Sequence, residues 1–219
     1  MNYIEKIETS RGPADRELMI LQEIRSFIRR EDAILLFKNA REKLININQW
    51  NELVGSQTTC FQLVTPAGQL MEASAGSNSY VRVDIAGKGS ETGYGYDWLQ
   101  IEDWVDMEDE NENLSLLSFS LRPSVNPEQK NEKTAHYFSA DSSITMLLRR
   151  EANNVKMSVF ETNLVINPVA EKSVAGTIRQ TLIGSAGVCG LTNNEWEEIV
   201  RNLLEIEMPK PGIQNSPKI

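Results

Sequence analysis

The sequence predicts an α+β protein built on one antiparallel, curved sheet of six to seven strands, with helices from both chain ends packed on it. Apolar residues recur at helical spacing near both ends of the chain, which predicts terminal helices. Between about 58 and 166 the period changes to two, and strands with one apolar and one polar face are typical of antiparallel sheets. Helices that are segregated from the strands in this way favour α+β over α/β.

The first helical region covers 13–45. Proline suits a first helical turn, so the Gly12–Pro13 pair marks its start. The first half carries an apolar stripe at helical spacing, formed by Leu18, Leu21, Ile24 and Ile28. A single helix of this length exceeds the usual range, so we expect a pair of helices, with Asp32 as the cap of the second.

Seven segments between the helical regions alternate between apolar and polar residues. They are 60–66, 69–74, 80–86, 98–105, 115–123, 143–151 and 155–166. Good turn residues join the last two segments at 152–154, and most of the strands are expected to form adjacent hairpins. Cys60, at the start of the first segment, is expected to be a small buried hydrophobic residue. The polar loop 122–134 is long enough to be mobile or functional.

Helical spacing returns after Asn167 and predicts a helix from about 170 to 183. Thr192 and Glu195 fit a capping box at the start of a last helix. The apolar side of that helix is formed by Trp196, Ile199, Val200, Leu203 and Leu204. Because no linker divides the chain, we expect 1–207 to form a single α+β domain and 208–219 to form a disordered C-terminal tail.

This order of elements is similar to StART-like helix-grip folds, in which a curved sheet wraps around a helix. A flatter two-layer sandwich satisfies the same pattern. Three features depart from the helix-grip arrangement, since two helices precede the sheet, the sequence shows no convincing first strand, and two helices rather than one follow the sheet. The analogy concerns the fold and carries no function by itself.

Composition and charge exclude several classes of partner. The chain of 219 residues is 40% hydrophobic and 24% charged, as in ordinary globular proteins, and its net charge is -9. Nucleic-acid binding needs concentrated Lys and Arg, but Arg29–Arg30 and Arg149–Arg150 are each followed by Glu, so we expect neither nucleic acid nor membrane as a partner. No apolar run approaches the ~20 residues that cross a bilayer. The polar N-terminus lacks a secretory signal, so we expect a cytoplasmic protein.

The most unusual stretch is 85–104, which is rich in glycine, aromatic and acidic residues. A P-loop is excluded because Gly89 follows Gly87–Lys88 where Ser or Thr is required. A dinucleotide-binding fingerprint is excluded because the glycine spacing is wrong and a strand follows where a helix is required. The stretch therefore predicts a glycine-rich hairpin, since glycine adopts the positive φ angles of tight turns.

The hairpin carries a candidate ligand-binding set, which consists of Tyr94, Tyr96, Asp97, Trp98 and Trp104. Exposed aromatic rings can stack on a sugar ring while a nearby carboxylate accepts hydrogen bonds from its hydroxyl groups. The four aromatic residues have the same parity, so they are expected on one face of the sheet. The alternative is structural, with the aromatic residues supporting the sheet by cross-strand pairing or lying beneath the N-terminal helices.

Catalytic and metal sites have weaker support. The acidic run 106–113 lacks the Gly and Glu positions of an EF-hand loop, which favours a solvated hairpin tip. The single histidine, His136, could pair with Cys60 or Cys189, but no nucleophile signature surrounds them. Carboxylates that could perform acid–base chemistry near the hairpin are Asp84, Asp97 and Glu102. We expect no metal and no cofactor.

The leading functional hypothesis is noncatalytic binding of a small molecule between the sheet and a helix, with 87–98 as the rim of the site. One alternative is a protein-interaction or scaffold domain that uses exposed aromatic residues and the last helix. A third is a hydrolase-type enzyme that uses the carboxylates or Cys189. The expected partner is thus a small molecule or a protein, and the sequence does not indicate an oligomeric state.

Overall fold

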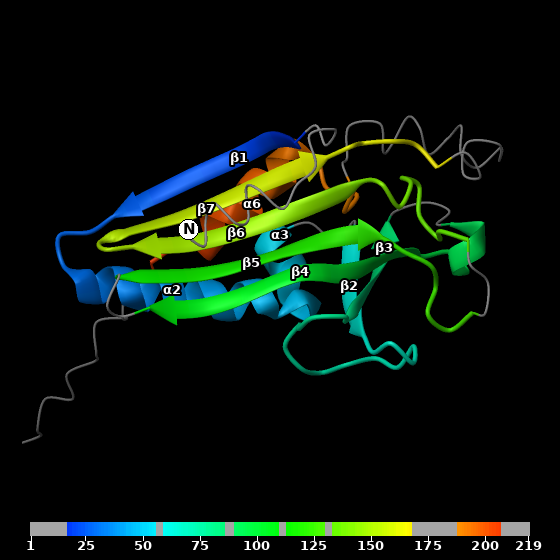
Figure 1. Cartoon of the computed structure of the whole chain (residues 1–219), viewed down its shortest axis with the longest axis horizontal. Coiled ribbons are helices and arrows are strands. Elements are labelled where there is room, and N and C mark those ends of the chain that lie inside the picture. Colours follow the sequence, from blue (N-terminus) through cyan, green and yellow to red (C-terminus); the bar gives the residue numbers. More distant parts are fainter. Residues whose placement is uncertain are drawn as a thin grey trace, which may run out of the picture.

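Figure 1 shows the computed structural model of the chain, which describes residues 17–55, 59–85, 90–109, 113–129, 133–167 and 188–206. Within these residues, seven strands form one sheet in the order β1-β7-β6-β5-β4-β3-β2, and all neighbouring pairs are antiparallel. The strands are β1 (Glu17–Ser26), β2 (Thr59–Val64), β3 (Tyr80–Ile85), β4 (Asp97–Asp109), β5 (Leu114–Pro123), β6 (Ser143–Glu151) and β7 (Asn154–Thr162). The helices are α2 (Arg30–Ile45), α3 (Trp50–Val54) and α6 (Asn193–Leu203), with short 3-10 turns η1 (Ile47–Gln49) and η2 (Glu91–Gly93). The predicted α+β class with a single antiparallel sheet is confirmed.

The helices cover one face of the sheet, called the helix face below, and the opposite side is the outer face (Figure 1). α2 contacts β6 and β7, while α6 contacts β1, α2 and α3. Helices from both chain ends therefore share one layer, as in the helix-grip arrangement. Alternate strand residues such as Leu99 and Phe119 form one core cluster with Trp50 and Trp196, and all four are at most 1% exposed. Burial of apolar area on this scale is the main source of stability.

The first strand is the largest departure from the prediction. A helix was expected over 13–45, but Glu17–Ser26 form β1 and α2 begins only at Arg30. β1 pairs with β7 at the edge of the sheet, so its conformation is set by a partner that is distant in sequence. Asp32 is not the helix cap, because Arg29 occupies that position and its guanidinium donates to the Asp32 carboxylate at 2.7 and 2.9 Å.

Exposure along β1 alternates with a period of two. Leu21, Glu23 and Arg25 are half-buried, and the residues between them are exposed. Ile24 is 50% exposed and Ile28 is 99% exposed, so these two residues of the predicted apolar stripe do not face the core, whereas Leu21 packs at its margin. This edge strand carries polar residues on both faces, so its sequence does not show the alternation of apolar and polar residues that would indicate a strand. The helical spacing of its apolar residues was therefore misleading.

The predicted number of strands is confirmed with one exchange. The segment 69–74 is not a strand, and its link to the sheet is an isolated bridge between Val64 and Leu70. β1, which was not predicted, takes its place in the count. Cys60 is exposed rather than buried, because Phe61 and Leu63 are the β2 residues that enter the core.

The remaining described elements follow the prediction. The glycine-rich stretch joins β3 to β4, the acidic run joins β4 to β5 although 106–109 belong to the strand, and β6 and β7 form a hairpin. The capping box of α6 is present: Thr192 Oγ1 accepts from the backbone N–H of Glu195 at 3.3 Å, and the Glu195 carboxylate accepts from the N–H of Thr192 at 2.8 Å. The helix predicted at 170–183 and the tail predicted at 208–219 lie outside the described residues.

The β2 edge of the sheet is covered by two asparagine side chains. Asn48 Oδ1 accepts a hydrogen bond from the backbone N–H of Leu63 at 2.7 Å, and Asn51 Oδ1 accepts one from the N–H of Phe61 at 3.2 Å. These are donors that an additional strand would use. The asparagines therefore block strand addition at β2. Sheet edges in proteins commonly carry protection of this kind.

Candidate functional site

β4 divides the predicted ligand-binding set between the two faces of the sheet. Asp97 pairs with Val83 across the β3–β4 hairpin, and Val83 and Leu99 both belong to the core cluster. Paired residues and residues two apart share a face, so Asp97 lies on the helix face. Trp98, the next residue, therefore lies on the outer face.

A β-bulge in β4 moves Trp104 to the helix face. The register with β5 shifts between Glu102 and Val105, and Asp103 has a positive φ of 51°. The extra residue reverses the alternation of the strand. Trp104 consequently stacks on the core residue Phe119, with ring centres 5.3 Å apart and an interplanar angle of 19°. The expectation that all four aromatic residues share one face is therefore wrong for Trp104.

The helix face carries a buried carboxylate and imidazole at the start of β4. Asp97 Oδ2 and His136 Nε2 are 4.0 Å apart, and the two side chains are 1% and 2% exposed. The backbone N–H of Phe138 donates to His136 Nδ1 at 2.9 Å, which assigns the proton of the neutral ring to Nε2, on the side of Asp97. A direct N–H···O hydrogen bond needs about 2.7–3.2 Å, so the separation suits an oxygen atom that bridges the two groups.

Backbone hydrogen bonds hold the His136 segment between the ends of the strands. The N–H of Trp98 donates to the carbonyl of Ala135 at 2.9 Å, and the N–H of Ala135 donates to the carbonyl of Ser124 at 2.8 Å. On the other side, Asn167 Nδ2 donates to the carbonyl of His136 at 3.0 Å. The imidazole is thus fixed by segments that adjoin β4, β5 and β7.

A small cluster on the outer face consists of Trp98, Tyr96, Tyr80, Val64 and Ala135. Trp98 is 1% exposed, and its indole N–H donates to the carbonyl of Gly93 at 3.2 Å. The guanidinium of Arg82 lies 4.4 Å from the centre of the Tyr96 ring, a cation–π contact. These contacts agree with the structural alternative for Trp98, whose ring is fully packed.

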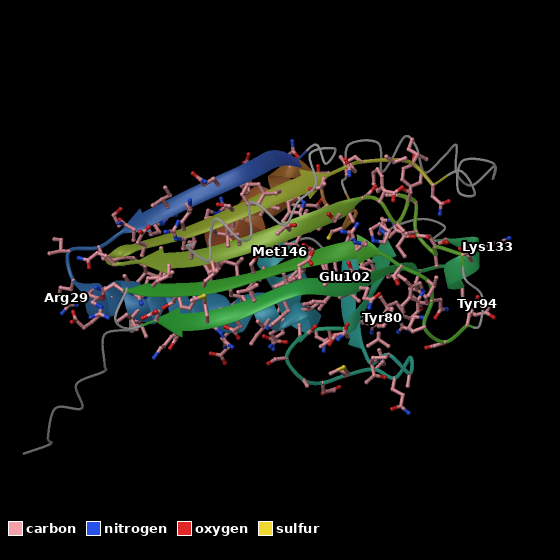
Figure 2. All side chains as sticks on the ribbon, in the orientation of Figure 1. Arg29, Tyr80, Tyr94, Glu102, Lys133 and Met146 are labelled. Atoms are coloured by element: carbon pink, nitrogen blue, oxygen red, sulfur yellow. The ribbon has the colours of Figure 1, made fainter. Side chains whose placement is uncertain are left out.

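Tyr94 is the exposed member of the predicted set. It is 71% exposed and has a positive φ of 54°. Figure 2 shows Tyr94 and Lys133 at one end of the molecule, with Arg29 at the other end. The turn around Tyr94 is closed by the N–H groups of Gly93 and Gly95, which both donate to the carbonyl of Ser90, at 3.1 and 2.9 Å. Tyr94 therefore lies in an exposed turn shortly before the start of β4, where Asp97 is located.

A second buried carboxyl group, Glu161, lies on the helix face near the end of β7. Burial raises the pKa of Glu161, which is 8% exposed, and a hydrogen bond from the backbone of Val188 opposes that rise. Cys189 is fully buried nearby, and burial, together with the charge of Glu161, raises the pKa of its thiol well above the ordinary value. Nucleophilic catalysis needs a thiolate, so this environment argues against Cys189 as a nucleophile.

The segment 188–191 spans the same end of the helix face from β7 to β3. Val188 and Cys189 interact with Glu161 at one side. At the other side Gly190, with a φ of +68°, approaches Ile85 so closely that an added Cβ would lie 2.4 Å from Ile85 Cδ1. The glycine therefore allows the chain to cross close to β3 immediately before α6.

The other candidate carboxylates do not form a pair with Asp97. Asp84 is exposed on β3, and Glu102 lies on the outer face, where it accepts a hydrogen bond from Arg122 Nε at 2.8 Å. Among the described residues, no group of three or more His, Cys, Asp or Glu side chains is placed to hold a metal ion. In the same residues, no helix has the length and apolar character needed to cross a membrane.

A shallow groove of about 560 Å³ lies between α2 and β4, lined by Lys38, Arg41, Glu42, Asp106, Met107 and Glu108. Arg41 and Asp106 form an ion pair there, with Nε and Oδ1 3.0 Å apart. The hydrogen bond to Asp106 raises the pKa of Arg41. Basic and acidic groups nearly balance in this groove, so it does not favour a charged ligand of either sign.

Comparisons with known proteins give only distant likenesses. No protein-family model matches the chain, and no curated protein matches its sequence. The structure of norcoclaurine synthase from Thalictrum flavum in complex with dopamine and hydroxybenzaldehyde is similar with 8% identity and a TM-score of 0.39, over 89% of this chain and 90% of that chain. Ara h 8.0201 is similar with 12% identity and a TM-score of 0.36, over 87% of this chain and 99% of that chain. Likenesses at this level assign the chain to no family.

Sequence reasoning singled out Asp97 but not its proximity to His136. Asp97 is the first residue of β4, whereas His136 lies in the segment between β5 and β6, and no local motif links them. Their proximity depends on the hydrogen bond between the backbones of Trp98 and Ala135, which follows from the packing of the 133–138 segment beside the sheet. A histidine beside two aromatic residues in a strand-like segment was the available signal, and it was too weak to specify a partner.

Proposed function

We propose that the protein binds a small, largely apolar molecule between the sheet and the helices, at the end of the helix face where Asp97 and His136 lie. The observation that carries this proposal is the burial of both side chains, at 1% and 2% exposure, with Oδ2 and Nε2 4.0 Å apart. Ionisable groups in an apolar interior are unfavourable for stability compared with a well-packed apolar core. Groups of this kind in an interior are frequent at functional sites.

The geometry favours a ligand that carries a hydroxyl group. A hydroxyl can donate to the Asp97 carboxylate and accept from Nε2–H of His136, which bridges two atoms 4.0 Å apart. The rest of the ligand would lie beside Tyr137 and Phe138, which belong to the core cluster next to His136, so an apolar or aromatic body suits the site. Tyr94 and the turn around it would form the rim.

The first test compares two probes that differ only in the hydroxyl proton, 2-naphthol and 2-methoxynaphthalene. Both have the same aromatic body, but the ether cannot donate a hydrogen bond to Asp97. We expect 2-naphthol to bind at least about tenfold more tightly, because a hydrogen bond to a charged group contributes roughly 1.5–3 kcal/mol. Binding is measured by the change in ligand fluorescence. Equal affinities, or no binding of either probe, would contradict the proposal.

Variants of one strand provide the matched control. Asp97→Asn keeps the size of the side chain and removes its charge, whereas Glu102→Gln makes the same change on the outer face of β4. Asp97→Asn should reduce the preference for 2-naphthol, and Glu102→Gln should leave it unchanged. Thermal melting of each variant shows whether it is folded. Native mass spectrometry of the gently purified protein then identifies any molecule retained by the unmodified chain and lost from Asp97→Asn.

A further inference from the structure

In the part of the chain that the structure describes, the β1 edge of the sheet is accessible, in contrast to the β2 edge. β1 is the last strand of the sheet order, and among the described residues no strand lies beyond it. Ile24, near the C-terminal end of β1, is 50% exposed, and Ser26 is exposed as well. No described side chain bonds to the backbone of Ile24 in the way that Asn48 and Asn51 bond to β2. A long edge without such protection is a template for strand addition.

The register with β7 shows which backbone groups of β1 face this open edge. The N–H of Phe27 donates to the carbonyl of Asn153 at 3.0 Å, so Phe27 faces β7. The register continues without a shift from Ser26 back to Leu21, and hydrogen-bonded residues alternate along an antiparallel strand. Arg25 and Glu23 therefore also face β7. The N–H and C=O groups of Ile24 and Ser26 face away from it.

We propose that two copies of the protein form a symmetric dimer in which their β1 strands pair antiparallel, with Ile24 opposite Ile24 of the second copy. In this register Ile24 exchanges two backbone hydrogen bonds with its counterpart, and Ser26 lies opposite Gln22 of the second copy. The two seven-stranded sheets then form one continuous sheet. The interface is isologous, as a two-fold axis requires.

The side chains of β1 select this register over its neighbours. With Ile24 on the two-fold axis, Glu23 of each copy lies opposite Arg25 of the other, in a non-hydrogen-bonded position where side chains approach closely. Displacing the register one step in one direction places Glu23 opposite Glu23, and in the other direction Arg25 opposite Arg25. Both alternatives put like charges in contact. Glu23 and Arg25 already form an ion pair within one strand, so the dimer would hold a ring of four alternating charges.

The same register brings apolar groups together on both faces. Leu21 and Phe27, which pack at the margin of the core cluster, lie opposite each other across the axis on the helix face. On the outer face the exposed Ile24 side chains meet. Aliphatic and aromatic cross-strand pairs of this kind stabilise antiparallel sheets. The occupant of this edge that the charges and apolar pairs fit is therefore a second copy of the chain.

A disulfide trap tests the register directly. Opposed hydrogen-bonded residues have Cα atoms about 5.5 Å apart, within the range that a disulfide spans. Ile24→Cys, made together with Cys60→Ser to remove the exposed thiol, should form a covalent dimer under mild oxidation. Ser26→Cys in the same background is the control, because the two Ser26 residues would be about 14 Å apart. Failure of Ile24→Cys to cross-link, or equal cross-linking of both variants, would overturn the proposal.

Sedimentation velocity over a range of concentrations provides a test without cysteine. Arg25→Glu should weaken the dimer because it sets like charges against each other, and the double exchange Glu23→Arg with Arg25→Glu should restore it. Ile24→Pro should abolish the dimer while sparing the monomer, because the lost N–H faces away from β7 and proline is tolerated at such edge positions. A wild-type chain that stays monomeric at sub-millimolar concentration, or an Ile24→Pro dimer as strong as the wild type, contradicts the proposal.

Discussion

The side-chain oxygen of Asn48 accepts a hydrogen bond from the backbone N–H of Leu63 at 2.7 Å, at the edge of β2 that faces away from β3. The amide nitrogen of the same side chain donates to the carbonyl of Met71 at 2.7 Å. One residue from the turn after α2 therefore provides hydrogen-bond partners for both β2 and the loop that returns beside it. Leu63 itself is fully buried, so the N–H that Asn48 serves lies against the core.

Asn48→Ala should lower the free energy of unfolding by about 1–3 kcal/mol, because it leaves buried backbone groups without their partner. Chemical denaturation measures the change. Gln49→Ala is the matched control, since Gln49 is the exposed neighbour in the same turn. An equal decrease in the free energy of unfolding of the two variants would show that the hydrogen bonds of Asn48 do not stabilise the protein.

Thr192→Ala should destabilise α6 and lower the free energy of unfolding by about 1 kcal/mol. The substitution removes the Oγ1 that accepts from the N–H of Glu195 at 3.3 Å. Because α6 buries Trp196 and Ile199 in the core cluster, fraying at its start should also be visible in the near-ultraviolet circular dichroism. Asn193→Ala, at the exposed next position, is the control and should melt like the wild type.

Much of the fold could be predicted because its signals are local. The alternation of Val81, Val83 and Leu99 and the capping box at Thr192 each depend on neighbouring residues, and both are present as expected. β1 could not be predicted in this way, since an edge strand with Glu23 and Arg25 on its half-buried face depends on pairing with β7. The local periodicity of a sequence does not indicate which distant strand a segment pairs with.

The candidate site was only partly predictable for the same reason. Asp97 was identified from its place in the aromatic hairpin, but parity alone could not show that a bulge at Asp103 separates Trp104 from Trp98. The position of His136 depends on a loop that bonds to the backbone of Trp98. Irregular backbone of this kind is set by tertiary contacts, so residue spacing does not encode it.

Gly190→Ala should lower the free energy of unfolding by roughly 1–3 kcal/mol, because it forces a side chain into a left-handed conformation and against a neighbour. Gly190 has a φ of +68°, and the added Cβ would lie 2.4 Å from Ile85 Cδ1. Ile85→Val removes that terminal carbon. The double variant should therefore recover part of the loss, and a double-mutant cycle by thermal denaturation measures the coupling. Strictly additive losses of stability would show that the contact with Ile85 is not the cause of the destabilisation by Gly190→Ala.

Glu161→Gln should stabilise the protein at neutral pH. Burial raises the pKa of Glu161 above its ordinary value of 4.5, so the folded chain binds this proton more tightly than the unfolded chain. Stability therefore falls as the pH rises from about the ordinary pKa through the raised one, and the full penalty applies above both. Glutamine carries no charge at any pH, and its side-chain oxygen can still accept the hydrogen bond from Val188.

The variant should thus be more stable than the wild type at pH 7, and this advantage should disappear as the pH falls below the ordinary pKa of 4.5. Denaturation curves measured at several pH values give the difference directly. Glu72→Gln, in an exposed loop, removes one negative charge without burial and should show no such convergence. A constant difference between Glu161→Gln and the wild type across this range would mean that the carboxyl group is not buried in its charged form. In that case, the contact between Glu161 and the segment before α6 would have to open in solution.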